Sequence, residues 1–412
     1  MSPTEIPTED RLLDTAAALF WEKGYAAAST REIAAALRIR QASLYYHVAS
    51  KEDLLYRICV SSLERFLAEV PAAVSQISSP LDRIRRLISA HVAALLDHRE
   101  RNATMLLELR SLAGRRRVQV VELRERYGNF VRSTLEEAQR TREVRDAISS
   151  THLCLALLNM LNWAALWFHP DQALSADKLA EIFGDLYLEG AASKDHRADG
   201  RWPPPVAISE APVIPGNKIA KTGESRRLER LLEAAVALFS RQGYAATSTR
   251  EVASLLGMQK ASLYYHIESK EDLLYFICKD SLERIREDVA AAVERAQDGL
   301  ERTSALIRAH VESMLRDQAE HATTLAEMHS LSPARRAQVV ALRDRYEDLV
   351  RSVLESAQRT GALRADIGVK YLSLGLLGLV NRVLVWYRRR GPLSPAELGQ
   401  LLAAIFLSGI KA

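Results

Sequence analysis

Apolar residues recur three and four positions apart along most of the chain, which is the spacing that places them on one face of an α-helix. The stretch from Leu12 to Phe20 shows this spacing first, and Gly24 follows it where many helices end on a left-handed residue. No stretch alternates between polar and apolar residues over more than a few positions, as a strand would. The pattern therefore predicts an all-α protein.

The chain contains a long internal repeat. Residues 11–190 align with residues 230–409 at a constant shift of 219 and without insertion, and about 85 of these 180 positions are identical. The identity rises to roughly 32 of the first 50 positions. This period is too long for a solenoid and is typical of a duplicated domain-sized unit. The proline-rich segment between the copies predicts a semi-extended linker, which would let the copies dock as a covalent, intramolecular pseudo-dimer.

Each copy begins with the same series of helix signals. A capping box, Ser29–Glu32 or Ser248–Glu251, predicts the start of a short helix. A second short helix is expected three or four residues after the first, and a serine followed by Lys-Glu-Asp then caps a long helix. The second short helices are expected at Gln41–His47 and Lys260–His266. The remainder of each copy predicts four or five further helices.

Two short helices joined by a tight turn, between a preceding helix and a long following helix, follow the helix-turn-helix plan. The motif Thr-Arg-Glu-(Ile/Val)-Ala, then Ala-Ser-Leu-Tyr-Tyr-His, then Ser-Lys-Glu-Asp-Leu-Leu, closely resembles the N-terminal domain of the tetracycline-repressor (TetR) family. It occurs at 11–60 and again at 230–279. The resemblance implies two tandem TetR-like units with helix-turn-helix domains at 1–60 and 226–279, helical ligand-binding and dimerisation domains at 61–191 and 280–412, and a linker at 192–225.

The second short helix carries the candidate DNA-reading residues. Small Ala42 and Ser43 allow a close approach to a major groove, and Leu44 is expected to point into the core. The Tyr-Tyr-His run offers hydroxyl and imidazole groups to phosphates, with packing of a helical core as the alternative, and Lys51 is expected at a phosphate. The candidates are Thr30, Arg31, Arg38, Arg40, Gln41, Ala42, Ser43, Tyr45, Tyr46, His47 and Lys51 in the first copy, and Thr249, Arg250, Gln259, Lys260, Ala261, Ser262, Tyr264, Tyr265, His266 and Lys270 in the second.

The copies differ where base reading is expected. Arg40-Gln41 becomes Gln259-Lys260, and because arginine favours guanine whereas glutamine favours adenine, the two half-sites of the operator are expected to differ. Arg38 occupies the turn position that is Gly257 in the second copy. Either the first turn is rearranged, or Arg38 contacts phosphates in compensation for a strained backbone.

The C-terminal part of each copy is similar to the acyl-CoA-responsive branch of the TetR regulators. A helical pocket of leucine and aromatic groups with a few arginines suits an amphiphilic anion such as an acyl thioester, although tryptophan and leucine at this spacing also suit an ordinary core. Because Arg382 replaces Trp163, the two pockets are not expected to bind alike. The candidate ligand-binding residues are Arg126, Tyr127, Asn162, Trp163 and Trp167, with Arg345, Tyr346, Asn381, Arg382 and Trp386 in the second copy.

Composition narrows the remaining choices. The 56 basic and 52 acidic residues nearly balance, so binding of double-stranded DNA must depend on where the bases lie. Three cysteines favour a reducing cytoplasm, and Cys59 and Cys278 fit a buried helix face better than a redox switch. The apolar stretches Thr151–Phe168 and Lys370–Tyr387 are interrupted by polar residues, which favours buried helices over membrane spans.

The sequence thus predicts a ligand-responsive transcriptional regulator that acts as a repressor and needs no cofactor. No histidine, cysteine or aspartate cluster has zinc-ligand spacing, so His91 and His310 are interpreted as ordinary helical residues and no metal site is expected. A glycine-rich phosphate loop and a nucleophile elbow are also absent, which disfavours a thioester-processing enzyme. A DNA-binding regulator without an effector remains an alternative, and the chain could act alone or as a homodimer.

Overall fold

The computed structural model describes residues 8–168, 174–193, 223–259, 263, 265, 267–409 and 411–412. In this part of the chain the elements are helices, with only two isolated β-bridges, as the all-α prediction requires. Most of the predicted linker lies outside the described residues. The helices of the first copy are α1 (Glu9–Lys23), α2 (Thr30–Ala36), α3 (Gln41–His47), α4 (Lys51–Val74), α5 (Pro80–Asp97), α6 (Arg99–Glu108), α7 (Gly114–Arg140), α8 (Ser150–Trp167) and α9 (Ala176–Glu189).

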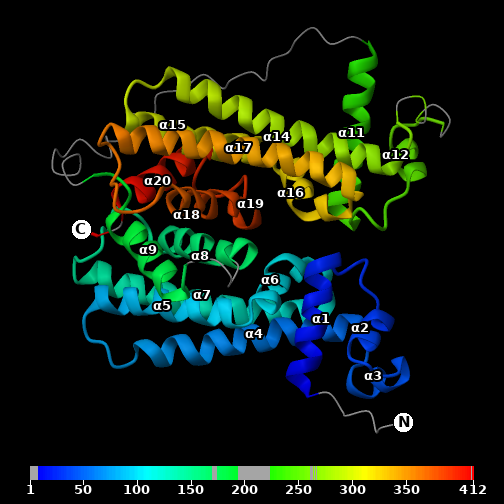
Figure 1. Ribbon diagram of the computed structural model, residues 1–412, viewed down its shortest axis with the longest axis horizontal. Helices are drawn as coiled ribbons and strands as arrows, with labels where there is room; N and C mark the ends of the chain where they lie inside the picture. Colours follow the sequence, from blue (N-terminus) through cyan, green and yellow to red (C-terminus); the bar gives the residue numbers. More distant parts are fainter. Residues whose placement is uncertain are drawn as a thin grey trace. The chain divides into compact units, whose positions relative to one another are not determined.

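The second copy repeats this order (Figure 1). Its helices are α11 (Gly223–Gln242), α12 (Thr249–Leu255), α14 (Lys270–Arg295), α15 (Gly299–Arg316), α16 (Gln318–Glu327), α17 (Pro333–Arg359), α18 (Val369–Asn381), α19 (Val383–Trp386) and α20 (Pro395–Ser408). A single 3₁₀ turn follows α6 at Leu109–Ser111 and α16 at Met328–Ser330. The predicted helix over Lys370–Tyr387 is instead broken at Arg382, where a polar pair interrupts the apolar run.

The chain folds into two compact units whose boundaries do not follow the sequence copies. Unit 1 contains Met1–Gly190 together with Leu374–Arg382 and Gly409–Ala412, and unit 2 contains Ala191–Ser373 and Val383–Ser408. In unit 1, the backbone N–H groups of Lys411 and Ala412 donate to the carbonyls of Leu188 and Glu143, both at 3.0 Å. In unit 2, the N–H of Ala191 donates to the Phe406 carbonyl at 2.8 Å. Each unit therefore includes the short tail that follows the last helix of the other copy.

Two glycines let the end of α18 approach α8 and α9 closely within unit 1. A Cβ atom built on Gly378 would lie 2.9 Å from the Trp163 Cβ, and one on Gly375 would lie 2.9 Å from a Leu186 methyl carbon. At Gly378 the neighbours include the Met160 backbone, which cannot move aside, so a larger residue there would separate the helices; at Gly375 the Leu186 methyl group would have to shift. The tight packing holds residues 374–382 firmly against the first copy's helices.

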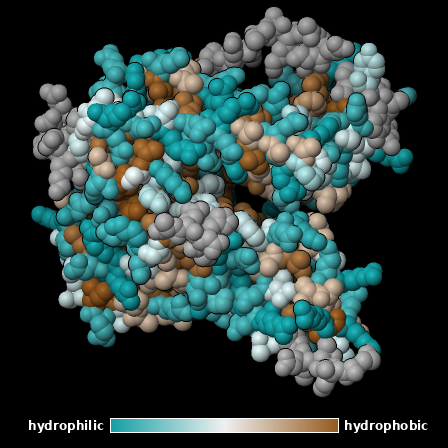
Figure 2. Space-filling view, in the orientation of Figure 1, coloured by the Kyte–Doolittle hydropathy of each residue, from teal (hydrophilic) through white to brown (hydrophobic). Residues whose placement is uncertain are grey.

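Among the described helices, the stretch Val369–Trp386 is long and apolar enough to cross a membrane by length and composition, with a mean hydropathy of 1.3. Its buried share inside the protein is 61%, and Arg382 interrupts it, which is the situation of a core helix. On the face shown in Figure 2, hydrophobic side chains are interspersed among hydrophilic ones.

Candidate nucleic-acid interface and effector site

A small core holds the three helices of the first reading head, by which we mean α1 to α3. Leu44 on α3 is fully buried, as predicted, and packs with the buried residues of α2. The predicted capping box starts α2: the Ser29 hydroxyl accepts from the Glu32 N–H at 3.2 Å, and the Glu32 carboxylate accepts from the Ser29 N–H at 2.9 Å. The core fixes how α3 lies and leaves its opposite face to solvent.

The exposed face of α3 carries the predicted reading residues. Tyr46 is 90% exposed and Tyr45 is 49% exposed, so the alternative that this pair packs into a core is wrong for Tyr46. Gln41 donates to the Thr30 hydroxyl at 3.1 Å, and that hydroxyl lies 3.1 Å from the Tyr45 hydroxyl. These contacts join α2 to α3 and hold three of the candidate side chains in place: Thr30, Gln41 and Tyr45. Among the other candidates, Arg31, Arg38, Arg40 and Ala42 are exposed, and Ser43 and His47 are partly buried.

The second reading head, α11 and α12 with the residues that follow, is built on the same plan. Leu263 is fully buried, Tyr265 is 80% exposed, and the capping box of Ser248 and Glu251 is present. Of the other candidates, Arg250 and Gln259 are exposed and Thr249 is partly buried. Lys260, Ala261, Ser262, Tyr264 and His266 lie outside the described residues.

The turn between α2 and α3 keeps its geometry despite the arginine. Arg38 has φ +59° and Gly257 has φ +64°. The N–H of Ile39 donates to the Ala34 carbonyl at 3.0 Å, and the equivalent bond from Met258 is 2.9 Å. The alternative of a rearranged first turn is therefore wrong, and Arg38 adopts the left-handed conformation that glycine adopts in the second copy.

We expect Arg38→Gly to stabilise the fold by about 0.5–1 kcal/mol, because a left-handed backbone costs an arginine more than the extra chain entropy costs a glycine. The measurement is the midpoint of urea unfolding, with Gly257→Arg as the matched opposite change. If Arg38 also contacts phosphate, the same variant binds DNA more weakly although it is more stable. If Arg38→Gly unfolds at a lower urea concentration than the wild type, the left-handed backbone at Arg38 is not strained.

Lys51 and Lys270 have partners other than the predicted phosphate. The Lys51 ammonium donates to the carbonyls of Tyr25, Ala26 and Ala28 at 2.8, 3.2 and 2.9 Å, and it lies 4.5 Å from the centre of the Tyr25 ring. Lys270 makes the equivalent bonds in the second copy. Burial lowers the pKa of both ammonium groups. In this conformation all three N–H bonds are used, so each lysine holds the loop before the helix-turn-helix, and a phosphate contact would have to displace a carbonyl.

A buried polar cluster lies among the C-terminal helices of unit 1. The Tyr127 hydroxyl lies 2.7 Å from His91 Nδ1, and the other ring nitrogen of His91 lies 3.3 Å from Asn162 Oδ1. Burial lowers the pKa of His91 to about 4, so the imidazole is neutral near pH 7. His310 and Tyr346 form the same pair in unit 2, with the two atoms 2.5 Å apart. Each of these helical histidines thus has a buried tyrosine partner, which the sequence analysis did not predict.

The predicted arginines of this pattern do not join the cluster. Arg126 and Arg345 are exposed, whereas the next residues, Tyr127 and Tyr346, are buried. Neighbouring positions on a helix point about 100° apart, which places these arginines at the surface beside a buried tyrosine. A ligand-binding role for Arg126 and Arg345 stays a prediction.

Arg382 is the buried arginine of the predicted ligand-binding set. It belongs to unit 1 and is 9% exposed, and among the described residues its side chain makes no ion pair or hydrogen bond. Burial and the nearby Arg124 guanidinium lower the pKa of Arg382 to about 10. The predicted second-copy set is divided, because Asn381 and Arg382 belong to unit 1 with Trp163 and Trp167, whereas Tyr346, Arg345 and Trp386 belong to unit 2.

Models of known protein families match both copies of the repeat. The family model for bacterial regulatory proteins of the tetR family matches residues 12–58 and 231–275. The model for the tetracyclin repressor-like C-terminal domain matches residues 78–191 and 296–410, which is more than half of the chain. The chain belongs to the TetR family. It carries two TetR N-terminal and two TetR C-terminal domains in tandem.

Individual TetR proteins match one copy at a time. The transcriptional repressor KstR2 of Mycobacterium tuberculosis is 29% identical over 195 residues, which are 47% of this chain and 97% of KstR2. The solved structure of PfmR from Thermus thermophilus is 34% identical, covers 43% of this chain and 96% of its own, and has a TM-score of 0.41. The structure of AibR in complex with isovaleryl coenzyme A and operator DNA is 27% identical over 42% of this chain and 95% of its own, with a TM-score of 0.39.

The cysteines of this TetR protein are buried. Burial raises the pKa of Cys59, Cys154 and Cys278 to about 12, which keeps each thiol protonated and slow to react. This supports the prediction of core thiols. No group of three potential ligands for a metal ion is found in the described part of the chain.

The surroundings of Glu320 on helix α16 disfavour the ionised form of its carboxyl group. The Glu320 side chain is 18% exposed and accepts from Arg284 at 3.2 Å. Burial, together with Asp317 and Asp280, raises the pKa of Glu320 to about 7 despite the arginine. The folded state therefore holds a proton that the unfolded chain releases near its ordinary pKa of 4.5.

Because the folded pKa lies above the unfolded one, we expect the stability contributed by protonated Glu320 to be lost as the pH rises from about 4.5 to about 7. Glu320→Gln removes this dependence. Solvent screening and the ion pair with Arg284 reduce the effect. As the pH rises through this range, the free energy of unfolding of the variant should increase relative to that of the wild type by on the order of 1 kcal/mol. Urea unfolding at acidic and mildly alkaline pH measures it, and parallel pH profiles for the two proteins would refute the shift.

Proposed function

We propose that this protein is a cytoplasmic transcriptional repressor whose single chain supplies both reading heads for a two-half-site DNA operator. The observation that carries the proposal is the repeated pattern of exposure in the heads: Tyr265 is exposed and Leu263 is buried in the second head, as Tyr46 and Leu44 are on α3, where Arg40 is also exposed. Aromatic hydroxyls and guanidinium groups on such a helix suit phosphate and base contacts. The name of the relative KstR2, a transcriptional repressor, supports the direction of control.

We propose further that the two half-sites are unequal. Exposed Arg40 stands at the start of α3, and exposed Gln259 occupies the aligned position in the second head. Arginine pairs with a guanine edge through two hydrogen bonds, whereas glutamine pairs with adenine. The operator is therefore a pseudo-palindrome whose halves differ near the bases that these residues face.

The effector that we propose is an amphiphilic anion, with an acyl-CoA thioester as the leading class. Arg382 supports this proposal because a buried guanidinium without a protein partner is costly unless an anion arrives to pair with it. The neighbouring helices supply tryptophan and leucine for an acyl chain, and His91, Tyr127 and Asn162 supply polar groups. The effector must bind differently to the DNA-bound and released conformations, because equal affinity would release nothing.

Selection of bound duplexes from random DNA tests the first two proposals together. We expect two half-sites of different sequence at one fixed spacing. Recovery of a single half-site, or of no sequence at all over competitor DNA at moderate salt, would overturn the proposal. Addition of palmitoyl-CoA to the selected complex then tests the effector, and unchanged DNA binding with a panel of acyl thioesters would favour a regulator without such an effector.

A further inference from the structure

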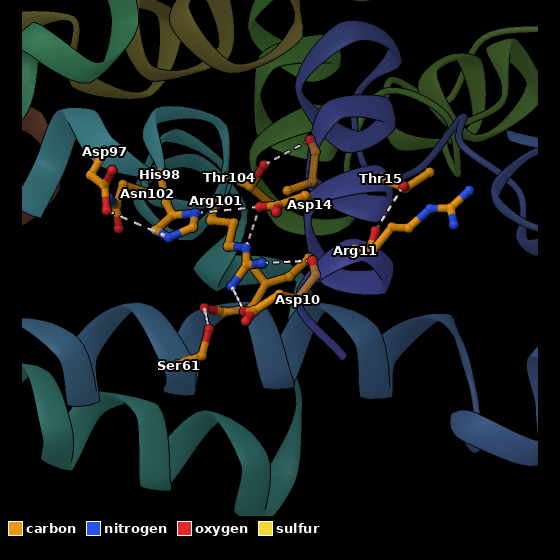
Figure 3. A network of polar contacts seen from close by, with 12 residues as sticks. Asp10, Arg11, Asp14, Thr15, Ser61, Asp97, His98, Arg101, Asn102 and Thr104 are labelled. Carbon is orange, nitrogen blue, oxygen red and sulfur yellow. Dashed lines mark hydrogen bonds and ion pairs between the residues drawn. The ribbon is translucent and has the colours of Figure 1, made fainter. Parts of the chain in front are cut away.

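The first reading head is fastened to helix α6 by charged groups, which Figure 3 shows. The Arg101 side chain, only 6% exposed, extends from α6 toward α1. Its guanidinium donates to an Asp14 carboxylate oxygen at 2.5 Å, to an Asp10 carboxylate oxygen at 3.0 Å and to the Asp10 carbonyl at 2.6 Å. His98 Nδ1 lies 3.4 Å from the same Asp14 oxygen. We call Arg101, Asp10, Asp14 and His98 the α1–α6 cluster.

Two further contacts reinforce this attachment. The Thr104 hydroxyl donates to the Ala17 carbonyl of α1 at 3.3 Å, and the Arg99 guanidinium lies 5.5 Å from the centre of the Trp21 ring. Helix α6 thus contacts α1 through side chains of its first two turns. A shift of α6 cannot leave α1 behind without breaking charged hydrogen bonds.

In the second copy the charges at these positions are reversed. Arg101 aligns with Glu320 and His98 with Asp317, while the acidic positions of α1 remain acidic in α11 as Glu229 and Glu233. An acidic α16 facing an acidic α11 cannot form the same cluster. The substitution changes which helix α16 is tied to.

Helix α16 is fastened to α14 instead. The Arg284 guanidinium of α14 lies 3.0 Å from Asp317 and 3.2 Å from Glu320. His321, the one basic residue of α16, lies 2.7 Å from the Ser281 hydroxyl of α14. Toward α11, the structure shows the neutral contact of Ser240 with Thr323 at 3.2 Å and the long bond from the Tyr244 N–H to Glu327 at 3.4 Å.

The difference is confined to α6 and α16, because the other attachment of the heads is the same in both copies. Arg116 at the start of α7 pairs with Asp53 at the start of α4 at 2.8 Å. Arg335 and Asp272 form the equivalent pair in unit 2. The heads also share the bond from the Tyr25 or Tyr244 N–H to Glu108 or Glu327, so they differ in the α1–α6 cluster.

We propose that the α1–α6 cluster makes the first reading head move with α6, whereas the second head lacks this charged link to α16 and follows α14. The regulatory consequence rests on the proposed function. When an effector displaces α6 and α16, the movement would be transmitted to the two heads through different helices. The first head responds directly, and the second responds only when the long helix moves. A fused chain can hold such an asymmetry, which a homodimer of identical subunits cannot encode.

Hydrogen–deuterium exchange on the full chain, without DNA or effector, tests the attachment independently of the proposed function. With Arg101→Met, we expect the amides of α1 to exchange about ten-fold faster, which corresponds to roughly 1.4 kcal/mol, while α11 is unchanged. Arg101→Lys keeps the positive charge but loses the forked hydrogen-bonding geometry of the guanidinium. Its α1 exchange rate should therefore fall between those of the wild type and Arg101→Met. Arg284→Met is the matched control, and it should loosen α16 from α14 while leaving exchange in α1 unchanged.

Two more measurements keep the inference falsifiable if Arg101→Met weakens the whole fold. High salt should speed exchange in α1 of the wild type more than in α11, because partly exposed charges join α1 to α6, whereas the described contacts between α11 and α16 are between uncharged groups. Glu320→Arg should slow exchange in α11, because it restores an arginine opposite Glu229 and Glu233. Equal salt effects on α1 and α11, or unchanged α1 exchange in Arg101→Met, would overturn the proposal.

Discussion

Disabling one reading head should lower the affinity for a two-half-site operator by about 10²–10⁴-fold, because the second head then no longer binds as a tethered partner at high effective concentration. The change is Tyr46→Ala with Arg40→Ala in the first head. Both side chains are exposed, so neither substitution should disturb the fold. Fluorescence anisotropy with the selected operator, at one fixed salt concentration, measures the loss.

The matched variant in the second head is Tyr265→Ala with Gln259→Ala. Each variant retains one unchanged head. It should bind the isolated half-site that this head recognises with the same affinity as the wild type. The double-head variant should bind only in the weak, non-specific manner of any basic surface. If either single-head variant retains the full affinity for the complete operator, the chain does not read its two half-sites together.

Local signals predicted the reading heads well. The capping serines at 29, 50, 248 and 269 and the inward leucines at 44 and 263 depend on residues only a few positions apart, and the structure places them as expected. The alignment of Arg38 with Gly257 predicted either a rearranged or a strained first turn, and the positive φ of both residues decides for the strained one. The positions of Tyr46 and Tyr265 needed the structure, since periodicity did not separate an exposed aromatic face from a core.

The C-terminal site was harder to predict because its contacts are distant in sequence. Nothing in the sequence places the His91 ring against Tyr127, which lies 36 residues away on another helix. Sequence self-similarity also could not show that Arg382 belongs to unit 1, since aligned positions were expected to occupy equivalent places. Lys51 shows the same limit on a smaller scale: a lysine at a helix start suits a phosphate or three nearby carbonyls, and only the loop geometry decides.

Arg382→Met should change stability and effector binding in opposite directions. In the protein without effector, the substitution replaces a buried charge that has no partner among the described residues with an apolar chain of similar length. Removing such a charge relieves its desolvation, and we expect a gain of about 1–3 kcal/mol in the free energy of unfolding. An anionic effector loses a charged hydrogen-bond donor worth about 1.5–3 kcal/mol, so its affinity should fall by about 10–100-fold.

Urea unfolding of the effector-free protein and calorimetric titration with palmitoyl-CoA measure the two effects separately. Arg345→Met is the matched control: this exposed arginine comes from the same predicted set and should change neither quantity. A purely structural arginine would give the opposite stability result, because removing it would break contacts that support the fold. Destabilisation by Arg382→Met would therefore reject Arg382 as an anion-binding residue, even if the probe failed to bind. Stabilisation together with lost binding identifies a guanidinium that serves ligand binding and lowers the stability of the fold.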